Sequence, residues 1–392
     1  MSETRYAWVV VWATFTCLAV IFGVSYSFAA FFESFAVEFH APRAEVALVF
    51  GLSGLIYFIG GAAAGLLSDR FGPRAVTVAG MLFIAAGLAA ASLADTIGLV
   101  YAAYGVGVGI GIALVYTPAM ANVPPWFDAR RGLAAGIASA GIGAGTLVVP
   151  LLAARAIALL DWRGALQALA LGVLIVGLGA TVLLKRAPAA VAARAGSAAG
   201  TTLRDAVASA DFRWLYLVCL LASPGMFIPF AHASAAARDL GVADAQAVGL
   251  VGLIGIGSLS GRFAIGGLAD RLGRQRTLAL TVASMGASYL VWHAAGGYPA
   301  MAVFALWMGL SYGGIVSLLP ALCMDLFGAR AVAAILGTLY TGAAFGNLIG
   351  PWGAGAVFDR FGSYTPVIWA CIAGCAVATW AALRIGGARS AG

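Results

Sequence analysis

The sequence GIGSLSGRFAIGGLADRLGRQRT, residues 255–277, joins a long apolar run to a dense cluster of charge. Its second half has the spacing G-x-x-x-D-R-x-G, and a near copy of that half, GLLSDRFGPR, stands at residues 65–74. Several other matches at an offset of about 200 residues indicate that one unit has been duplicated. They pair Pro118 with Pro320, FDAR at 127–130 with FGAR at 327–330, and Pro150 with Pro351.

The composition places the chain in a membrane. Hydrophobic residues make up 62% and charged residues only 9%, too little polar surface to cover a water-soluble fold. Most uncharged runs are close to the ~20 residues that cross a ~30 Å hydrocarbon layer as a helix, and they lack the alternation of a barrel. One longer run, 277–324, breaks at the turn sequence AAGGYP, 294–299. We therefore predict an all-α membrane protein with twelve transmembrane helices in two pseudo-symmetric six-helix bundles.

The only long polar stretch, 185–213, predicts a cytoplasmic linker between bundles at 1–184 and 214–392, with a short amphipathic helix near 203–209. The run at 6–32 is too long for the core of a signal peptide, so we expect it to remain as the first helix. Both termini are expected in the cytoplasm, because that orientation puts 16 of the 22 Lys and Arg residues inside.

The charge and the cysteines exclude other classes of protein. The net charge of +7 follows from the inside bias and from contact with the lipid bilayer, and it gives no support to nucleic-acid binding. All five cysteines lie in apolar spans without the partners that a metal site would need. We therefore expect them to be core residues, and we expect neither a metal nor a cofactor. An intramembrane enzyme would require clustered His, Asp or Cys residues at helical spacing, which the sequence lacks.

The two G-x-x-x-D-R-x-G copies resemble the signature of the major facilitator superfamily, in which substrate is held between two six-helix halves. The stretch WFDARRGLAAGIASAGIGAG, 126–145, resembles the helix 4 to 5 signature of its monocarboxylate porter family. Segments 23–39, 228–241 and 320–328 are similar to bacterial members. The resemblance implies a monomeric secondary transporter in the bacterial cytoplasmic (inner) membrane. Its substrate would be a small monocarboxylate of the pyruvate or lactate type, moved together with a proton.

The charged copies also predict a conformational latch. Asp69 and Asp270 stand at helix ends, where each can accept from backbone amides or pair with arginines of neighbouring loops. Such contacts can close the cytoplasmic side in one state and open in the other; the alternative is plain topology-determining charge. The predicted latch residues are Asp69, Arg70, Arg74, Arg130, Arg131, Asp270 and Arg271.

Arg262 is the predicted anchor for the substrate carboxylate. An ionised side chain in a membrane span costs at least ~2.5–3.5 kcal/mol, and those that persist usually serve a function. A guanidinium offers a rigid fork that suits a carboxylate. The corresponding position of the first half is Gly61, so the fold itself does not require the charge. Arg262 also matches the helix 8 arginine to which the family resemblance assigns carboxylate binding; the alternative is an arginine that snorkels to the cytoplasmic boundary.

Further candidates surround this arginine. Ser258 lies one turn earlier on the same face, where many animal members of the family have an aspartate linked to proton coupling. Those members also have a lysine near Ala30, whereas the only lysine here is Lys185. His232, after Pro224 and Pro229, could carry a proton, or the carboxylate itself could. The remaining predicted binding residues are Tyr116, Tyr340, Asn122, Asn347 and Tyr26.

Two related functions stay open. An oxalate or formate type of antiporter would require two cations for a dicarboxylate, and residues 331–358 contain no Lys or Arg. A drug or metabolite efflux carrier of the same fold would usually place an acid in its cavity, whereas the one internal charge here is positive.

Overall fold

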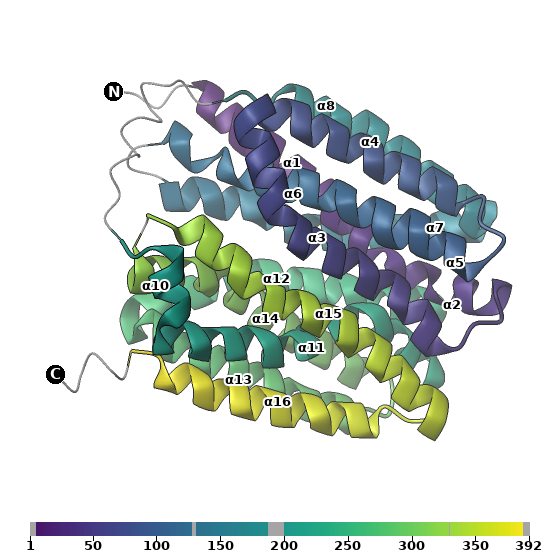
Figure 1. Cartoon of the computed structure of the whole chain (residues 1–392). Coiled ribbons are helices and arrows are strands. Elements are labelled where there is room, and N and C mark those ends of the chain that lie inside the picture. The colour runs from purple at the N-terminus through teal and green to yellow at the C-terminus, as the bar shows by residue number, and fades with distance from the viewer. Residues whose placement is uncertain (1–4, 128–130, 187–199, 329, 387–392) are drawn as a thin grey trace. The chain divides into compact units, whose positions relative to one another are not determined.

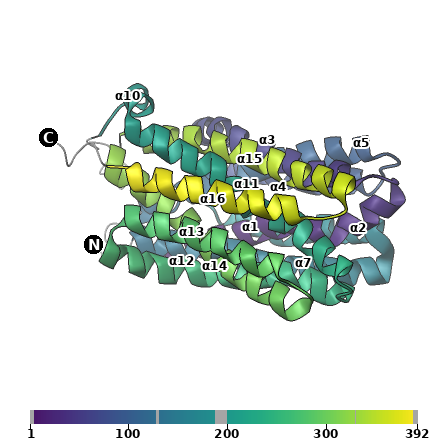
Figure 2. The same cartoon turned by 90° about the horizontal axis from the view of Figure 1, so that it is seen from below.

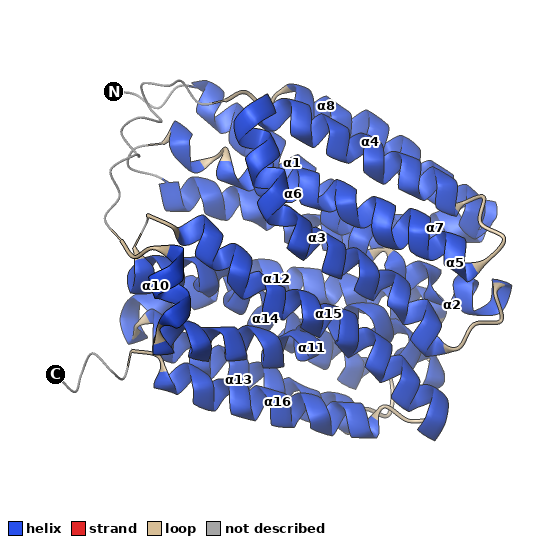
Figure 3. Ribbon diagram, in the orientation of Figure 1, coloured by secondary structure: helices blue, strands red, loops and turns tan. Residues whose placement is uncertain are grey.

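The computed structural model describes residues 5–127, 131–186, 200–328 and 330–386. These residues are helical almost throughout (Figures 1 and 3), and the only β interaction among them is an isolated bridge between Gly200 and Gly328. The chain divides into two compact units, unit 1 from Met1 to Gly196 and unit 2 from Ser197 to Gly392.

Unit 1 contains six spans. The first is interrupted at Ser27, between α1 and α2, and the Ser27 hydroxyl donates to the Gly23 carbonyl at 2.7 Å. The fifth and sixth spans meet at Asp161, where φ is +62° and the helix is broken. The elements are α1 (Arg5–Tyr26), α2 (Phe28–Glu38), α3 (Arg43–Phe71), α4 (Pro73–Ala91), α5 (Ile97–Val100), the π-helix η1 (Tyr101–Val108), α6 (Gly109–Ala121), the 3-10 turn η2 (Pro124–Trp126), α7 (Arg131–Gly172), the π-helix η3 (Val173–Gly177) and α8 (Leu178–Val182).

Unit 2 contains the other six spans, preceded by a short helix at the end of the linker. The elements are α10 (Leu203–Ala208), α11 (Ala210–Asp239), α12 (Asp244–Leu272), α13 (Arg274–His293), α14 (Tyr298–Phe327), α15 (Val332–Phe361) and α16 (Thr365–Arg384). The predicted short helix near 203–209 is confirmed as α10, which begins with Thr202 accepting from the Asp205 amide.

Ten helical segments of the described chain are long and apolar enough to cross a membrane. One of them, Gly132–Val182, has 51 residues and supplies two spans because of the break at Asp161. The remaining span is α13, the least apolar of the long helices, which begins with Arg274 and Arg276. The described helices therefore agree with the twelve predicted spans.

The duplication is visible in the packing. In unit 1, α1 packs on α7 and α3 on α6; in unit 2, their counterparts α11 on α15 and α12 on α14 make the same pairs. In both views α16 runs beside α13 (Figures 1 and 2). The equivalent contact in unit 1 is that of α4 with the second half of the α7 to α8 segment. The two signature copies also end their helices alike: Gly72 has φ +88° and Gly273 φ +83°, a conformation that favours glycine.

Candidate functional site

The candidate site of unit 2 is built on the contact between α12 and α14. Glycines on both helices let the two backbones approach closely, as small residues do in membrane bundles. A Cβ atom at any of four glycines would collide with a backbone carbonyl of the opposite helix, so the contact fixes this part of α12. The four are Gly257 and Gly261 on α12, facing Leu306 and Leu310, and Gly309 and Gly313 on α14, facing Ile254 and Ser258.

Arg262 follows this contact directly. It is only 8% exposed, and its Nε and Nη2 atoms are buried without a hydrogen-bond partner among the described residues. Long helical side chains commonly lean toward the N-terminus of their helix, a lean that would bring the guanidinium over the turn that carries Ser258. Ser258 is 2% exposed, and its buried hydroxyl likewise has no partner in the described chain. Three buried polar atoms on one helical face are thus unpaired, and such groups are rare unless a ligand or water binds them.

The buried state of Arg262 differs from that of a snorkelling side chain. A snorkelling arginine buries its methylene stem and exposes its charged end to water. Here both unpaired nitrogens lie within the protein. Both nitrogens are therefore free to donate to a bound anion or to water.

His232, on α11, is fully buried, and both of its ring nitrogens are engaged. Nε2 lies 2.8 Å from the Pro351 carbonyl, and Nδ1 lies 2.9 Å from the Tyr364 hydroxyl. A carbonyl can only accept, so Nε2 donates to Pro351, whereas the bond between Nδ1 and the Tyr364 hydroxyl can run in either direction. The ring therefore links α11 to α15 and to the start of α16.

Depth along the helices separates His232 from Arg262. His232 lies seven residues before the end of α11, whereas Arg262 lies 18 residues into α12, which starts after the next turn. At ~1.5 Å per residue the two Cα atoms are ~10 Å and ~27 Å from that turn. A role for His232 in substrate binding stays a prediction.

In unit 1, Tyr116 and Tyr26 belong to one aromatic cluster around Phe22. The Tyr116 ring lies 5.6 Å from the Phe22 ring in an edge-on arrangement, and the Tyr26 ring lies 5.8 Å from it. Tyr116 is half-buried and Tyr26 is buried. In unit 2, Tyr340 is half-buried and Asn347 buried, both on α15. Their roles in binding are untested predictions.

Asn122 has a contact that the sequence did not suggest. Its side-chain amide donates to the Lys185 carbonyl at 2.9 Å and so ties the end of α6 to the chain just beyond α8. The two residues are 63 positions apart, and no local pattern marks the pair. This bond accounts for one donor of Asn122; binding of substrate by this residue remains a prediction.

The predicted latch carboxylates, Asp69 and Asp270, are exposed at the ends of α3 and α12. Three ion pairs of the described chain involve other groups: Arg163 with Glu38, Arg238 with Asp244, and Arg274 with Asp325. Near Asp69, the Arg186 guanidinium donates to the backbone carbonyls of Ser68 and Asp69, at 3.1 and 2.7 Å. Arg70, Arg74 and Arg271 are also exposed, Arg130 lies outside the described residues, and Arg131 begins α7.

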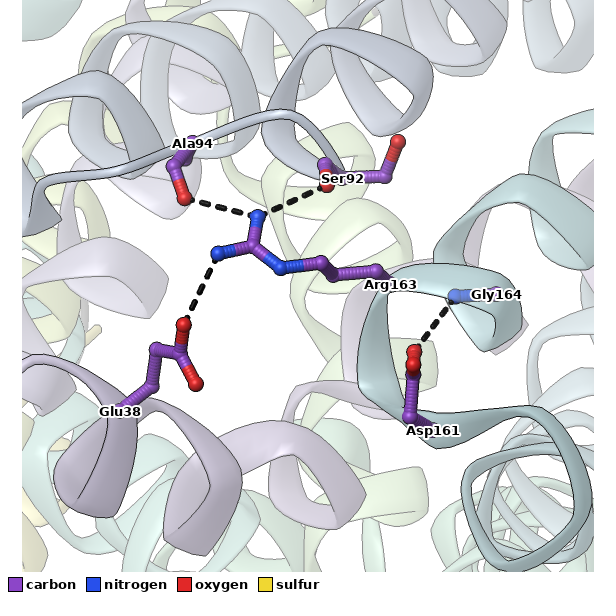
Figure 4. A network of polar contacts seen from close by, with 6 residues as sticks. All are labelled: Glu38, Ser92, Ala94, Asp161, Arg163 and Gly164. Carbon is purple, nitrogen blue, oxygen red and sulfur yellow. Dashed lines mark hydrogen bonds and ion pairs between the residues drawn. The ribbon is translucent and has the colours of Figure 1, made fainter.

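Arg163 forms a polar network that the sequence did not predict, at the end of unit 1 where α2 and α4 end (Figure 4). Arg163 donates through Nη1 to the carbonyls of Ser92 and Ala94, at 3.0 and 2.9 Å, and through Nη2 to Glu38 at 2.8 Å. It therefore joins the sixth span to the ends of α4 and α2. The residue at the same offset of 201 in unit 2 is Tyr364, the partner of His232, so the two halves use different chemistry at one position.

The chain is similar to known membrane transporters. The family model described as the Major Facilitator Superfamily matches residues 14–351 and, in a second match, 215–390. Monocarboxylate transporter 13 of Bos taurus is 29% identical over 364 residues, 92% of this chain and 84% of that protein. The uncharacterised MFS-type transporter YhjX of Escherichia coli is 26% identical, over 83% of this chain and 82% of its own length. A crystal structure of the peptide transporter POT in complex with sulfate has the same fold, with a TM-score of 0.76, 14% identity, and coverage of 97% and 95%.

Proposed function

Because the chain belongs to the major facilitator superfamily, we propose that this transporter carries small monocarboxylates of the pyruvate or lactate type by alternating access. The similarity to the bovine monocarboxylate transporter supports this substrate class. The observation that carries the proposal is the buried, unpaired guanidinium of Arg262.

The pattern of unpaired atoms matches a carboxylate. Nε and Nη2 form one edge of the guanidinium plane, where two N–H bonds point in the same direction. A carboxylate can accept from both through its two oxygens, in parallel charge-assisted hydrogen bonds. The same guest neutralises a charge that is costly inside a membrane span. A monocarboxylate is sufficient for this purpose, since one positive charge requires one negative charge.

We propose that a proton accompanies the anion. The bound anion neutralises the Arg262 charge. A proton carried on the carboxyl group or on His232 would then give the loaded carrier one additional positive charge. The serine at position 258 cannot take the part of an ionisable aspartate, so any coupling in this chain uses another group. We further propose that the protein works in the bacterial cytoplasmic membrane as a monomer, with both termini inside.

Uptake into proteoliposomes tests the function. Labelled lactate and pyruvate should enter faster when the outside is acidic, and Arg262→Ala should lower that uptake at least ~10-fold, because two charge-assisted hydrogen bonds are lost. Arg276→Ala is the matched control, since Arg276 is an exposed arginine outside the site. Wild-type uptake in the Arg262→Ala variant would reject the anchor. Uptake that requires internal carboxylate and ignores pH would replace symport with exchange.

A further inference from the structure

We infer that the Ser258 hydroxyl binds the oxygen on carbon 2 of the substrate, and that the carrier therefore selects 2-hydroxy and 2-oxo acids over unsubstituted short acids. The inference rests on the proposed function, because Arg262 must hold the carboxylate for Ser258 to reach the neighbouring carbon. It assigns to Ser258 a specificity role that is separate from the anchoring of charge.

The Ser258 hydroxyl is in an unusual state for a helical serine. Serine and threonine in helices commonly donate to the carbonyl four residues earlier. Thr146, Thr281 and Ser260 do so here, at 2.7, 2.7 and 3.0 Å. Ser258 lies on the same helix as Ser260 and is buried, yet its Oγ has no partner among the described residues.

Ser258 is also well placed relative to Arg262. Side chains four residues apart on a helix have Cβ atoms ~5–6 Å from each other, and long side chains such as that of Arg262 commonly lean toward the preceding turn, here that of Ser258. A carboxylate on the Nε and Nη2 edge therefore presents its carbon 2 to the region of the serine. Another buried hydroxyl without a partner in the described chain, that of Ser53, lies on α3 of unit 1 and has no arginine one turn away.

The backbone that carries the Ser258 hydroxyl is held rigidly. The Ser258 carbonyl faces Gly313 of α14 so closely that a Cβ there would collide with it. The backbone of Ser258 is consequently held by packing, and a fixed hydroxyl can discriminate between substrates more sharply than a mobile one.

The chemistry of the hydroxyl suits both acid types. A serine can donate to the keto oxygen of a 2-oxo acid and can either donate to or accept from the hydroxyl of a 2-hydroxy acid. An unsubstituted acid would leave the buried hydroxyl unpaired, which is how a site built for a polar group rejects the analogue that lacks it.

Competition against labelled lactate uptake in proteoliposomes tests the inference, with unlabelled lactate, pyruvate and propionate as probes. Wild-type protein should prefer lactate and pyruvate over propionate by roughly 3- to 10-fold. Ser258→Ala should remove this preference by weakening the two oxygenated acids, with propionate unchanged. Ser258→Thr, which keeps a hydroxyl, should retain part of it. Ser260→Ala, the matched control on the exposed face, should behave as wild type.

The inference is overturned if wild-type protein does not distinguish lactate from propionate, or if Ser258→Ala weakens both acids equally. Either result leaves the proposed function intact so long as Arg262→Ala abolishes uptake of all three acids. Failure of the proposed function looks different, because wild-type protein would then transport no monocarboxylate at all.

Discussion

At the scale of single residues, Arg262 combines a feature visible in the sequence with one visible only in the structure. An isolated charge within an apolar run, with glycine at the equivalent place of the other half, identified it as a candidate. The absence of hydrogen-bond partners for Nε and Nη2 among the described residues depends on what surrounds the side chain. No sequence pattern reports that.

The buried, unpaired guanidinium of Arg262 should lower the stability of the protein while serving its function. Replacing Arg262 by methionine, which has similar length and no charge, should raise the unfolding temperature of the substrate-free protein in detergent. An unsatisfied buried polar group costs about 1–3 kcal/mol, and methionine removes it. The same variant should lose carboxylate uptake. Arg276→Met should leave both properties near wild type, and a lower unfolding temperature for Arg262→Met would mean that the guanidinium has partners after all.

Contacts between distant residues set the limit of prediction at this scale. His232 meets Pro351 and Tyr364, which are 119 and 132 positions away, and Asn122 meets Lys185. The sequence identified His232 and Asn122 as polar residues in apolar spans. Which partners they have depends on how the helices pack, and that information is spread over the whole unit.

At the scale of helices, the approach of α12 to α14 determines where Ser258 and Arg262 lie. Glycines are frequent on both helices, and small residues let membrane helices approach closely. The sequence could not identify which glycines face a backbone, since glycines with free space around them, such as Gly266 and Gly267, stand on the same helix.

Two glycine substitutions on α12 separate packing from helix propensity. Gly261→Ala should lower the unfolding temperature, because the new methyl group collides with the Leu310 carbonyl, and overpacking typically costs 1–3 kcal/mol. Gly267→Ala should keep or raise it, because nothing lies within 4 Å of the added Cβ and alanine favours helix by up to ~1 kcal/mol. Equal effects of the two changes in thermal unfolding would show that α12 and α14 do not pack this closely.

The Arg163 network offers a second prediction for helix packing. Arg163→Met should destabilise the protein by more than ~1 kcal/mol, because it leaves the Ser92 and Ala94 carbonyls without their donor. Glu38→Gln removes only the ion pair, whose groups are 32% and 40% exposed and screened by solvent, so its cost should stay below ~1 kcal/mol. Thermal unfolding of both variants is the measurement. A larger loss for Glu38→Gln would assign the stabilisation to charge instead.

At the scale of the whole chain, the repeat made the architecture predictable. Matches at one offset identified two six-helix units, and their equivalent helices pack in equivalent pairs. Local irregularities were not predictable: the interruption at Ser27 and the π-helical turns η1 and η3 lie inside uniformly apolar runs. An apolar run specifies a span by its length and leaves the hydrogen-bond register open.

The proposed orientation predicts which loops face outward. A cysteine at Asp95, between α4 and α5, should react with a membrane-impermeant maleimide in intact cells, whereas one at Arg204 in α10 should react only after the cells are opened. Both positions are exposed, and the five native cysteines are buried, so the background should be low. The reverse pattern of labelling would show that the protein has the opposite orientation in the membrane.

The most direct test of the central claim is the effect of lactate on thermal unfolding of purified wild-type and Arg262→Ala protein. Binding to the folded state alone should stabilise wild type by about 2.7 kcal/mol at a lactate concentration 100-fold above the dissociation constant, raising the unfolding temperature. Arg262→Ala should unfold at the same temperature with and without lactate. An equal rise in both proteins would contradict the account, because lactate would then bind without the arginine.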